Sequence, residues 1–260
     1  MTLRRVPVVL AIALLLAALA AVARAELIQQ GNLRVFFDGR LAPQALPRER
    51  PAPVTVSLDG SVATADGTLP PQLREMTIAV NRAGKVSVAG LPRCPAGVLQ
   101  QTSTQAALER CRQALVGRGH FAANVNFPDA PLIPAHGDVL AFNSRIHGRA
   151  GLLLHLYGTT PVRAAFVLPF TIARQEGEFG TVFSTRIPEL ASDLGYVTDI
   201  QMTMGRKYSY RGERRSFLSA SCAAPAGFPG AIFTLARATF VFANGQRLST
   251  ALARDCKVRG

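Results

Sequence analysis

The amino-acid sequence predicts a mainly β fold, a β-sandwich with one inserted α-helix near residues 103–116. Apolar and polar residues alternate along most of the chain, which is typical of half-buried strands. Turn sequences that contain glycine separate these runs at strand-length intervals. A chain of this length can form one large β domain, or two packed β-subdomains with a soft boundary near residues 128–137.

The first 25 residues have the pattern of a secretory signal peptide. Arg4 and Arg5 precede an unbroken apolar run from Val6 to Val22, and Ala23-Arg24-Ala25 supplies small residues for cleavage. We therefore expect the mature chain to begin near Glu26, outside the cytoplasm, and to be secreted or kept in the cell envelope. An uncleaved signal anchor is the alternative, because the run approaches the roughly 20 residues that span a bilayer. No second long apolar run follows, so we expect no transmembrane segment after the signal is removed.

Three clear runs of alternation predict strands at 54–58, 76–80 and 121–127. Between the early strands, residues 42–53 contain four prolines with mixed charges, and we expect them to form a crossing loop between sheets. The segment 223–230, rich in proline and glycine, is expected to do the same near Cys222.

One amphipathic helix interrupts the β pattern. Small and apolar residues recur at helical spacing between Ser103 and Val116, Thr102 or Ser103 can cap the start, and Gly117 is placed to end it. A second, shorter helix is predicted at Pro188–Leu194, where proline occupies the first turn.

Several turns are predicted from dipeptides that end in glycine, among them Asp59-Gly60, Asp66-Gly67 and Arg211-Gly212. Asn244-Gly245 is the strongest hairpin signal, and we expect a type I′ turn between strands at 238–243 and 247–253.

A further hairpin is expected around residues 147–152. If four residues separate its strands, Ser144 lies opposite His155, and His147 and His155 fall on opposite faces of the hairpin. A slip of one residue would reverse that conclusion.

The four cysteines predict two disulfides, since an even number in an exported chain is typical of an oxidising compartment. Of the three possible pairings we favour Cys94–Cys111 and Cys222–Cys256, because each closes a short loop within one half of the chain. A zinc site is the alternative, but no Cys-x-x-Cys or neighbouring histidine supports it. We expect no metal and no cofactor.

The chain is strongly basic. Removing Arg4, Arg5 and Arg24 with the leader lowers 29 basic residues to 26, against 16 acidic ones, which leaves a net charge of about +10. An exported cation of this kind would be drawn to anionic polymers or lipid headgroups of its own envelope. No physiological nucleic-acid partner is expected outside the cytoplasm, and the sequence leaves the oligomeric state open.

The densest basic segment is the candidate ligand-binding site. In an extended strand Arg206, Tyr208 and Tyr210 share one face, and Lys207, Ser209 and Arg211 share the other. Arginine forks bind oxyanions and tyrosine rings stack on sugars or bases. An exposed hairpin tip whose charges prevent aggregation is the alternative. The candidate residues, which we call the basic hairpin, are Arg206, Lys207, Tyr208, Tyr210, Arg211, Arg214 and Arg215.

No catalytic motif stands out, and we predict no catalytic residues. Gly-x-Ser-x-Gly and Ser-x-x-Lys do not occur. Glu176 and Glu178 flank a glycine in an apparent turn, where exposed acids are ordinary. Asp38, Asp59 and Asp66 precede glycines, and hairpin turns explain them better than calcium loops do.

Two sets of motifs carry a resemblance to known sequences. The first set is Leu69–Arg74, Gly90–Cys94, Cys111 and Val116-Gly117, and it resembles exported surface modules of high-GC Gram-positive bacteria. The second is Arg206–Ser221, which is similar to uncharacterised secreted proteins of the same lineage. The resemblance implies an exported β-sandwich and carries no catalytic residue. The chain differs from the surface modules in having no tandem array and in placing its second cysteine inside a helix.

Three functions are consistent with these observations. The first is a non-enzymatic, disulfide-stabilised envelope protein that binds anionic polymer or lipid headgroups through the basic hairpin. The second is an extracellular hydrolase whose site gathers distant residues such as His147, His155, Asp193 or Asp199. The third is a purely structural or subunit-contact module.

Overall fold

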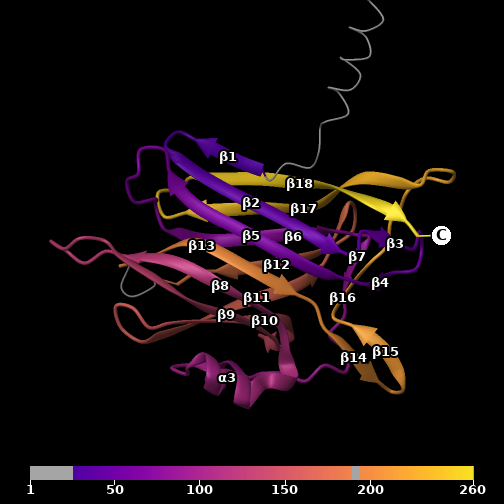
Figure 1. The fold of residues 1–260 in the computed structure, drawn as a ribbon, viewed down its shortest axis with the longest axis horizontal. Coiled ribbons are helices and arrows are strands. Elements are labelled where there is room, and N and C mark those ends of the chain that lie inside the picture. The colour runs from indigo at the N-terminus through magenta and orange to yellow at the C-terminus, as the bar shows by residue number, and fades with distance from the viewer. Residues whose placement is uncertain (1–25, 189–193, 260) are drawn as a thin grey trace, which may run out of the picture.

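The structure, a computed structural model, describes residues 26–188 and 194–259 (Figure 1). The predicted signal peptide lies outside these residues. In chain order the elements are β1 (Glu26–Gln30), β2 (Leu33–Ala42), β3 (Ala45–Leu46), β4 (Ala52–Pro53), β5 (Thr55–Thr64), β6 (Leu73–Asn81), β7 (Gly84–Val86), α2 (Ala96–Leu99), α3 (Thr104–Cys111), the 3₁₀ turn η1 (Arg112–Ala114), β8 (Leu115–Val125), β9 (Ile133–Ile146), β10 (Arg149–Gly158), β11 (Ala164–Arg174), β12 (Phe179–Arg186), β13 (Gly195–Met204), β14 (Lys207–Tyr210), β15 (Glu213–Ser216), β16 (Leu218–Ala220), β17 (Gly230–Phe242) and β18 (Arg247–Val258). The fold is mainly β, as predicted.

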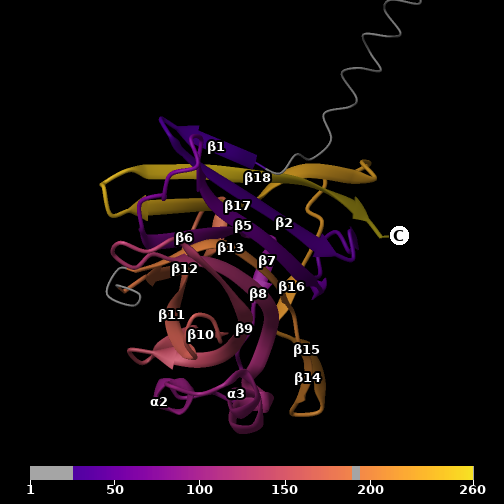
Figure 2. The same cartoon turned by 60° about the vertical axis from the view of Figure 1, so that its left-hand side comes forward.

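Thirteen strands form one continuous, curled sheet in the order β1-β2-β5-β13-β8-β9-β10-β11-β12-β6-β17-β18-β3. The strands β8 to β11 form a sharp bend, so that β2, β5 and β13 lie over β6, β17 and β18 as a second layer (Figure 2). Two small sheets, β14-β15 and β4-β16-β7, are attached to this body. The two layers of the predicted sandwich thus come from a single sheet, and the proposed subdivision near 128–137 stays a prediction.

Side chains join the two ends of the curled sheet. The Thr250 hydroxyl on β18 donates a hydrogen bond to the Glu26 carboxylate on β1 over 2.6 Å. Deeper in, the Arg254 guanidinium forms a buried ion pair with Asp38 and donates to the Gly39 carbonyl over 2.8 Å. Burial opposes ionisation of Asp38, but hydrogen bonds from Arg254 and the Gly39 N–H outweigh it and lower the pKa of the carboxyl.

The bend of the sheet depends on glycines where neighbouring backbones come close. A Cβ on Gly119 of β8 would lie 1.9 Å from the Gln201 carbonyl oxygen, and one on Gly137 of β9 would lie 2.0 Å from that of Tyr157. No side chain fits at either position, so strand residues without Cβ allow the strong local coiling.

Strand β10 shows how the two faces of the sheet are used. Leu152, Leu154 and Leu156 point between the layers, whereas Leu153 and His155 point outward beneath α2 and α3. The helices therefore cover the outside of the bend rather than the inside of the sandwich (Figure 2).

The predicted helix forms, and the Ser103 hydroxyl caps it by accepting the Ala106 N–H over 3.2 Å. Its predicted end is wrong, because the α-helix stops at Cys111 and Gly117 already belongs to β8. A Cβ there would lie 2.9 Å from the Met204 side chain and 3.1 Å from the Thr203 carbonyl, so this glycine serves strand packing rather than a helix stop. The helix predicted at 188–194 falls mainly on residues outside the described ranges.

Both predicted disulfides are present, with Cα–Cα distances of 5.5 Å for Cys94–Cys111 and 5.7 Å for Cys222–Cys256. The first fastens α3 to the loop before α2, and the second fastens the loop after β16 to β18.

The proline-rich loop 42–53 carries β3, which pairs in the large sheet, and β4, which pairs in a small one. Arg48 within this loop donates a hydrogen bond to the Phe228 carbonyl over 3.0 Å. The two proline-rich segments therefore lie together.

The hairpin turns differ from their predicted types. At 242–247 only Gly245 has a positive φ, and its N–H donates to the Phe242 carbonyl over 3.0 Å, so the turn is type I with a left-handed glycine rather than type I′. The two-residue turn with both φ positive occurs instead at His147 (48°) and Gly148 (76°).

This tighter turn overturns the predicted register between β9 and β10. Ile146 pairs with Arg149, so His155 lies opposite Leu140 rather than Ser144. The turns predicted at Asp38-Gly39 and Asp59-Gly60 are also wrong, since both dipeptides lie inside strands β2 and β5. No helix in the described parts of the chain has the length and apolar character needed to cross a membrane.

Candidate functional site

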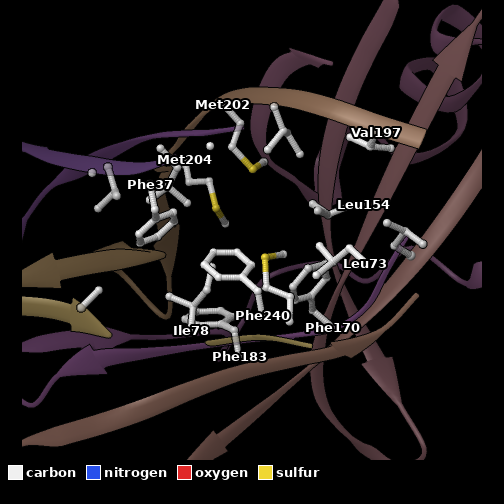
Figure 3. A pocket seen from close by; sticks show the side chains of 18 of the residues that line it. Phe37, Leu73, Ile78, Leu154, Phe170, Phe183, Val197, Met202, Met204 and Phe240 are labelled. Carbon is white, nitrogen blue, oxygen red and sulfur yellow. The ribbon is translucent and has the colours of Figure 1, made fainter. Parts of the chain in front are cut away.

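An apolar cavity of about 240 Å³ lies between the two layers of the sheet (Figure 3). One layer contributes Phe37 of β2 and Met202 and Met204 of β13 to the cavity wall. The opposite layer contributes Ile78 and Phe240. Apolar side chains from the bend, including Leu154 and Phe170, complete the wall, so nearly the whole lining is hydrocarbon or thioether.

The cavity exists because the facing layers do not pack fully against each other. Leu58, Met76, Ile78, Phe183 and Ile200 all point inward yet remain only partly buried. In a sandwich packed to the usual density, inward side chains on central strands would be fully buried. Their residual exposure is therefore surface that faces the cavity.

The two ends of the cavity differ. At one end the small sheet β4-β16-β7 covers it, and the lining residues Leu41, Val54 and Ala220 are buried. At the other end, where β13 begins, residues 195–200 are all half-buried and Pro188 is exposed. We call this second end the open end, because the described lining residues there keep part of their surface exposed.

Among the described residues that line the open end, Asp199 on β13 carries the only carboxyl group. Burial raises the pKa of this carboxyl, and the neighbouring carboxylate of Asp59 raises it further. No cation forms an ion pair with Asp199 within the described ranges. The rest of the lining offers few polar atoms, so a ligand held here would be bound mainly by burial of apolar surface.

Sequence reasoning missed this cavity. All three methionines beyond residue 1, Met76, Met202 and Met204, line it. Methionine is flexible and polarisable and is over-represented at adaptable apolar binding surfaces. The three methionines lie on only two strands, β6 and β13, and this clustering was the sequence signal that could have indicated an apolar binding surface.

The basic hairpin forms as strands β14 and β15 with Arg211-Gly212 at the tip. The predicted alternation is present, but the face with the rings is turned inward. The Tyr208 hydroxyl donates to the Ala89 carbonyl over 2.8 Å, and the Tyr210 ring packs on Gly90 so closely that a Cβ there would lie 2.2 Å from it.

Two of the arginines also have structural partners. Arg206 donates to the Leu115 carbonyl over 2.8 Å, and Arg215 pairs with Glu213 over 2.8 Å. The other three cations of the hairpin are exposed and form no ion pair within the described residues, although Arg211 lies over the Tyr210 ring. These three, which we call the outward cations, are Lys207, Arg211 and Arg214. The binding role of the hairpin stays a prediction.

The residues considered for a hydrolytic site are not brought together. His147 lies in the exposed turn before β10, whereas His155 lies six residues, about 20 Å, along β10 from its first residue. His155 is on the outer face of the sheet under the helices, while Asp199 lies on β13 near the open end. Asp193 lies outside the described residues. Glu176 and Glu178 are both exposed beside the turn before β12. The Glu178 carboxylate forms an ion pair with the Arg237 guanidinium over 3.9 Å.

His155 is a buried structural residue. Its Nε2 lies 3.0 Å from the Thr102 carbonyl oxygen, which fixes the loop between α2 and α3 on the sheet. Burial lowers the pKa of its imidazole, and the hydrogen bond to Thr102 offsets this only in part. In the part of the chain that the structure describes, no three His, Cys, Asp or Glu residues are grouped as a metal site would require.

Fold and site together define a disulfide-bonded, mainly β protein with an apolar cavity between two layers of one curled sheet. The two disulfides are compatible with a stabilised domain outside the cytoplasm. Comparison with protein-family models, with curated proteins and with solved structures gives no match.

Proposed function

We propose that this protein binds an apolar or amphipathic small molecule and holds its apolar part in the cavity between the layers. The cavity itself carries the proposal. Its volume of about 240 Å³ is more than ten times the roughly 10–15 Å³ that one water molecule needs. Its lining has few partners for water, and apolar cavities of this kind stay dry and take up apolar guests.

The lining also supports a flexible ligand rather than a rigid polar one. Met76, Met202 and Met204 can adapt to guests of different shape. Specific recognition normally needs a few convergent polar groups, and they are scarce inside this cavity. A hydrocarbon chain, with any polar head left at the open end, therefore fits the site best. With the expected export signal, the role we propose is that of an extracytoplasmic carrier or scavenger of such molecules.

The absence of tryptophan from the chain permits a direct test. Met202 and Gln201 are neighbours on β13, the first lining the cavity and the second exposed on the outer face. We would make Met202→Trp and the matched control Gln201→Trp and titrate each with a long-chain fatty acid that carries bromine, a fluorescence quencher. The proposal predicts saturable quenching at position 202 and little at position 201.

Equal quenching at both positions, or none at either, would contradict the proposal. Binding of the apolar dye N-phenyl-1-naphthylamine by the unmodified protein, and its displacement by the unlabelled acid, provides a second readout that does not depend on the substitution. Failure of the dye to bind would count against the cavity even if the tryptophan variants were unstable.

The exposed cations favour a second function, the contact with anionic envelope components that the sequence predicted. Lys207, Arg211 and Arg214 are exposed, and no acidic side chain among the described residues pairs with them. Such a cluster attracts polyanions in a salt-dependent way. This function is compatible with ligand binding in the cavity, since the hairpin lies apart from the start of β13 (Figure 1), whose first residues line the open end.

Changing the outward cations to glutamine tests this second function without disturbing the packed face of the hairpin. We expect the triple variant to lose retention on anionic cell-wall polymer at low salt. A control triple variant at three exposed arginines on other elements, Arg118, Arg149 and Arg247, removes the same net charge. Equal losses in the two variants would show that net charge, not the hairpin, is responsible.

A further inference from the structure

Three exposed apolar side chains lie on two neighbouring loops of the bend. Phe127 and Leu132, in the loop between β8 and β9, are 37 % and 43 % exposed. Val162, in the loop between β10 and β11, is 67 % exposed. Monomeric proteins seldom gather large apolar side chains on protruding loops without a partner surface.

Strand pairing places both loops at the open end of the cavity. Val125, the last residue of β8, pairs with Ile133 of β9 and with Gly195, the first residue of β13 that lines the open end. Gly158, the last residue of β10, pairs with Gly137 of β9 and with Ala164 of β11. The loops 126–132 and 159–163 thus project from the same end of adjacent strands, the end at which β13 begins (Figure 1). The first residues of β13 line the open end of the cavity.

We propose that this end of the molecule docks on a lipid bilayer, with Phe127, Leu132 and Val162 inserted among the lipids. The inference rests on the proposed binding of an apolar ligand. Such a ligand is concentrated in membranes, because water excludes hydrocarbon. Docking with the open end against the bilayer lets the ligand pass between membrane and cavity without crossing water, and interfacial insertion of apolar side chains supplies the attachment.

The charges on the two loops indicate which lipid charge the bilayer needs for the protein to attach. Each loop carries one charged residue, Asp129 in the first and Arg163 in the second, so together they are electrically neutral. Attachment through these loops should therefore occur on zwitterionic lipid and depend weakly on salt. Attachment through the outward cations of the hairpin would instead require anionic lipid and weaken with salt.

The test is flotation of the full protein with vesicles of pure phosphatidylcholine, compared with vesicles that also contain phosphatidylglycerol. The variant Phe127→Ser/Val162→Ser removes one apolar side chain from each loop. The matched control is Phe228→Ser/Ile232→Ser, which removes two side chains that are 61 % and 76 % exposed at the opposite end, where β17 begins.

We expect the unmodified protein and the control variant to float with both kinds of vesicle. The loop variant should lose about tenfold in partitioning for each side chain, since burying one such side chain is worth at least that ratio. Flotation of the loop variant equal to that of the control, or flotation only with phosphatidylglycerol at low salt, would overturn the docking proposal.

Binding of N-phenyl-1-naphthylamine in the absence of vesicles separates this proposal from the one on which it rests. The loop variant should bind the dye as the unmodified protein does. Dye binding with no flotation of any protein would refute docking alone, whereas flotation without dye binding would refute the cavity as the ligand site.

Discussion

Replacement of Leu154 by phenylalanine should change stability much less than the same replacement at Leu153. The two residues are neighbours on β10 and both are almost inaccessible, 5 % and 1 % exposed respectively. Leu154 faces the cavity, while Leu153 faces the outer cluster beneath the helices, with Leu99, Ala107 and Phe142. The pair therefore compares a wall of the cavity with a closely packed layer in the same strand.

The expected difference follows from the space available to the larger ring. Inserting extra carbons into a well-packed core forces side chains and backbone to shift and typically costs about 1–3 kcal/mol. We expect Leu153→Phe to fall in that range, because the disulfide Cys94–Cys111 limits how far the helices can move away. Leu154→Phe can extend into about 240 Å³ of empty space and should stay within about 1 kcal/mol of the unmodified protein.

Equilibrium unfolding in urea, or the thermal midpoint, measures the difference. For a chain of this size 1 kcal/mol corresponds to about 2–4 °C in Tm, so a separation of several degrees between the variants is expected. The double variant should equal the sum of the single effects if the two faces of the sheet are independent. Equal, large destabilisation by both substitutions would refute the existence of the cavity.

Three further predictions concern ionisation and cross-linking. Because burial holds the pKa of His155 below 6.5, unfolding should become easier as the pH falls below about 6.5, and His155→Gln should remove this dependence while His147→Gln should not, as urea midpoints at successive pH values will show. Because the pKa of Asp199 is raised above 3.8 in the folded state, Asp199→Asn should stabilise the protein at pH 7 and have no effect well below pH 3.8, and an equal effect at both would refute the cause given. Replacing Cys222 and Cys256 together by alanine should lower the free energy of unfolding by about 4 kcal/mol, the loop-closure value for a separation of 34 residues, and an unchanged Tm would count against it.

Local signals in the sequence were sufficient for much of the fold. Alternation located β5, β6 and β8, the cap at Ser103 located the helix start, and the short loops between cysteines led to both disulfides. Each of these features depends on residues close together in the chain. Their physical causes, side-chain period, capping and loop entropy, can be evaluated without the tertiary structure.

Features that depend on distant residues were not predictable in the same way. Asp59-Gly60 has an ordinary turn signal, yet it lies in β5 because it pairs with β2. Gly117 has an ordinary helix-stop signal, yet it lies in β8 because the neighbouring strand β13 approaches it closely. The turn at His147-Gly148 requires a positive φ at a histidine, and residue type alone does not predict this conformation. Because His147 adopts it, the turn has two residues, and this turn length sets the register of β9 and β10.

The candidate sites show the same division. The alternation of the basic hairpin was predicted correctly, but its orientation was not, because the docking of Tyr208 and Tyr210 on the loop around Gly90 is a long-range contact. The cavity arises from the curl of thirteen strands and from how far apart that curl leaves two layers. No local pattern reports that distance, although the placement of Met76, Met202 and Met204 was consistent with an adaptable apolar surface.

A crystal structure of the protein grown with a brominated long-chain fatty acid would test the central proposal most directly, because anomalous scattering locates the bromine without ambiguity. We predict a bromine peak between the layers, among Leu154, Met202 and Ile78, with the carboxyl group toward residues 195–199. A peak confined to the outer surface, or a space between the layers closed by the side chains that line it, would contradict the assignment of a ligand site there.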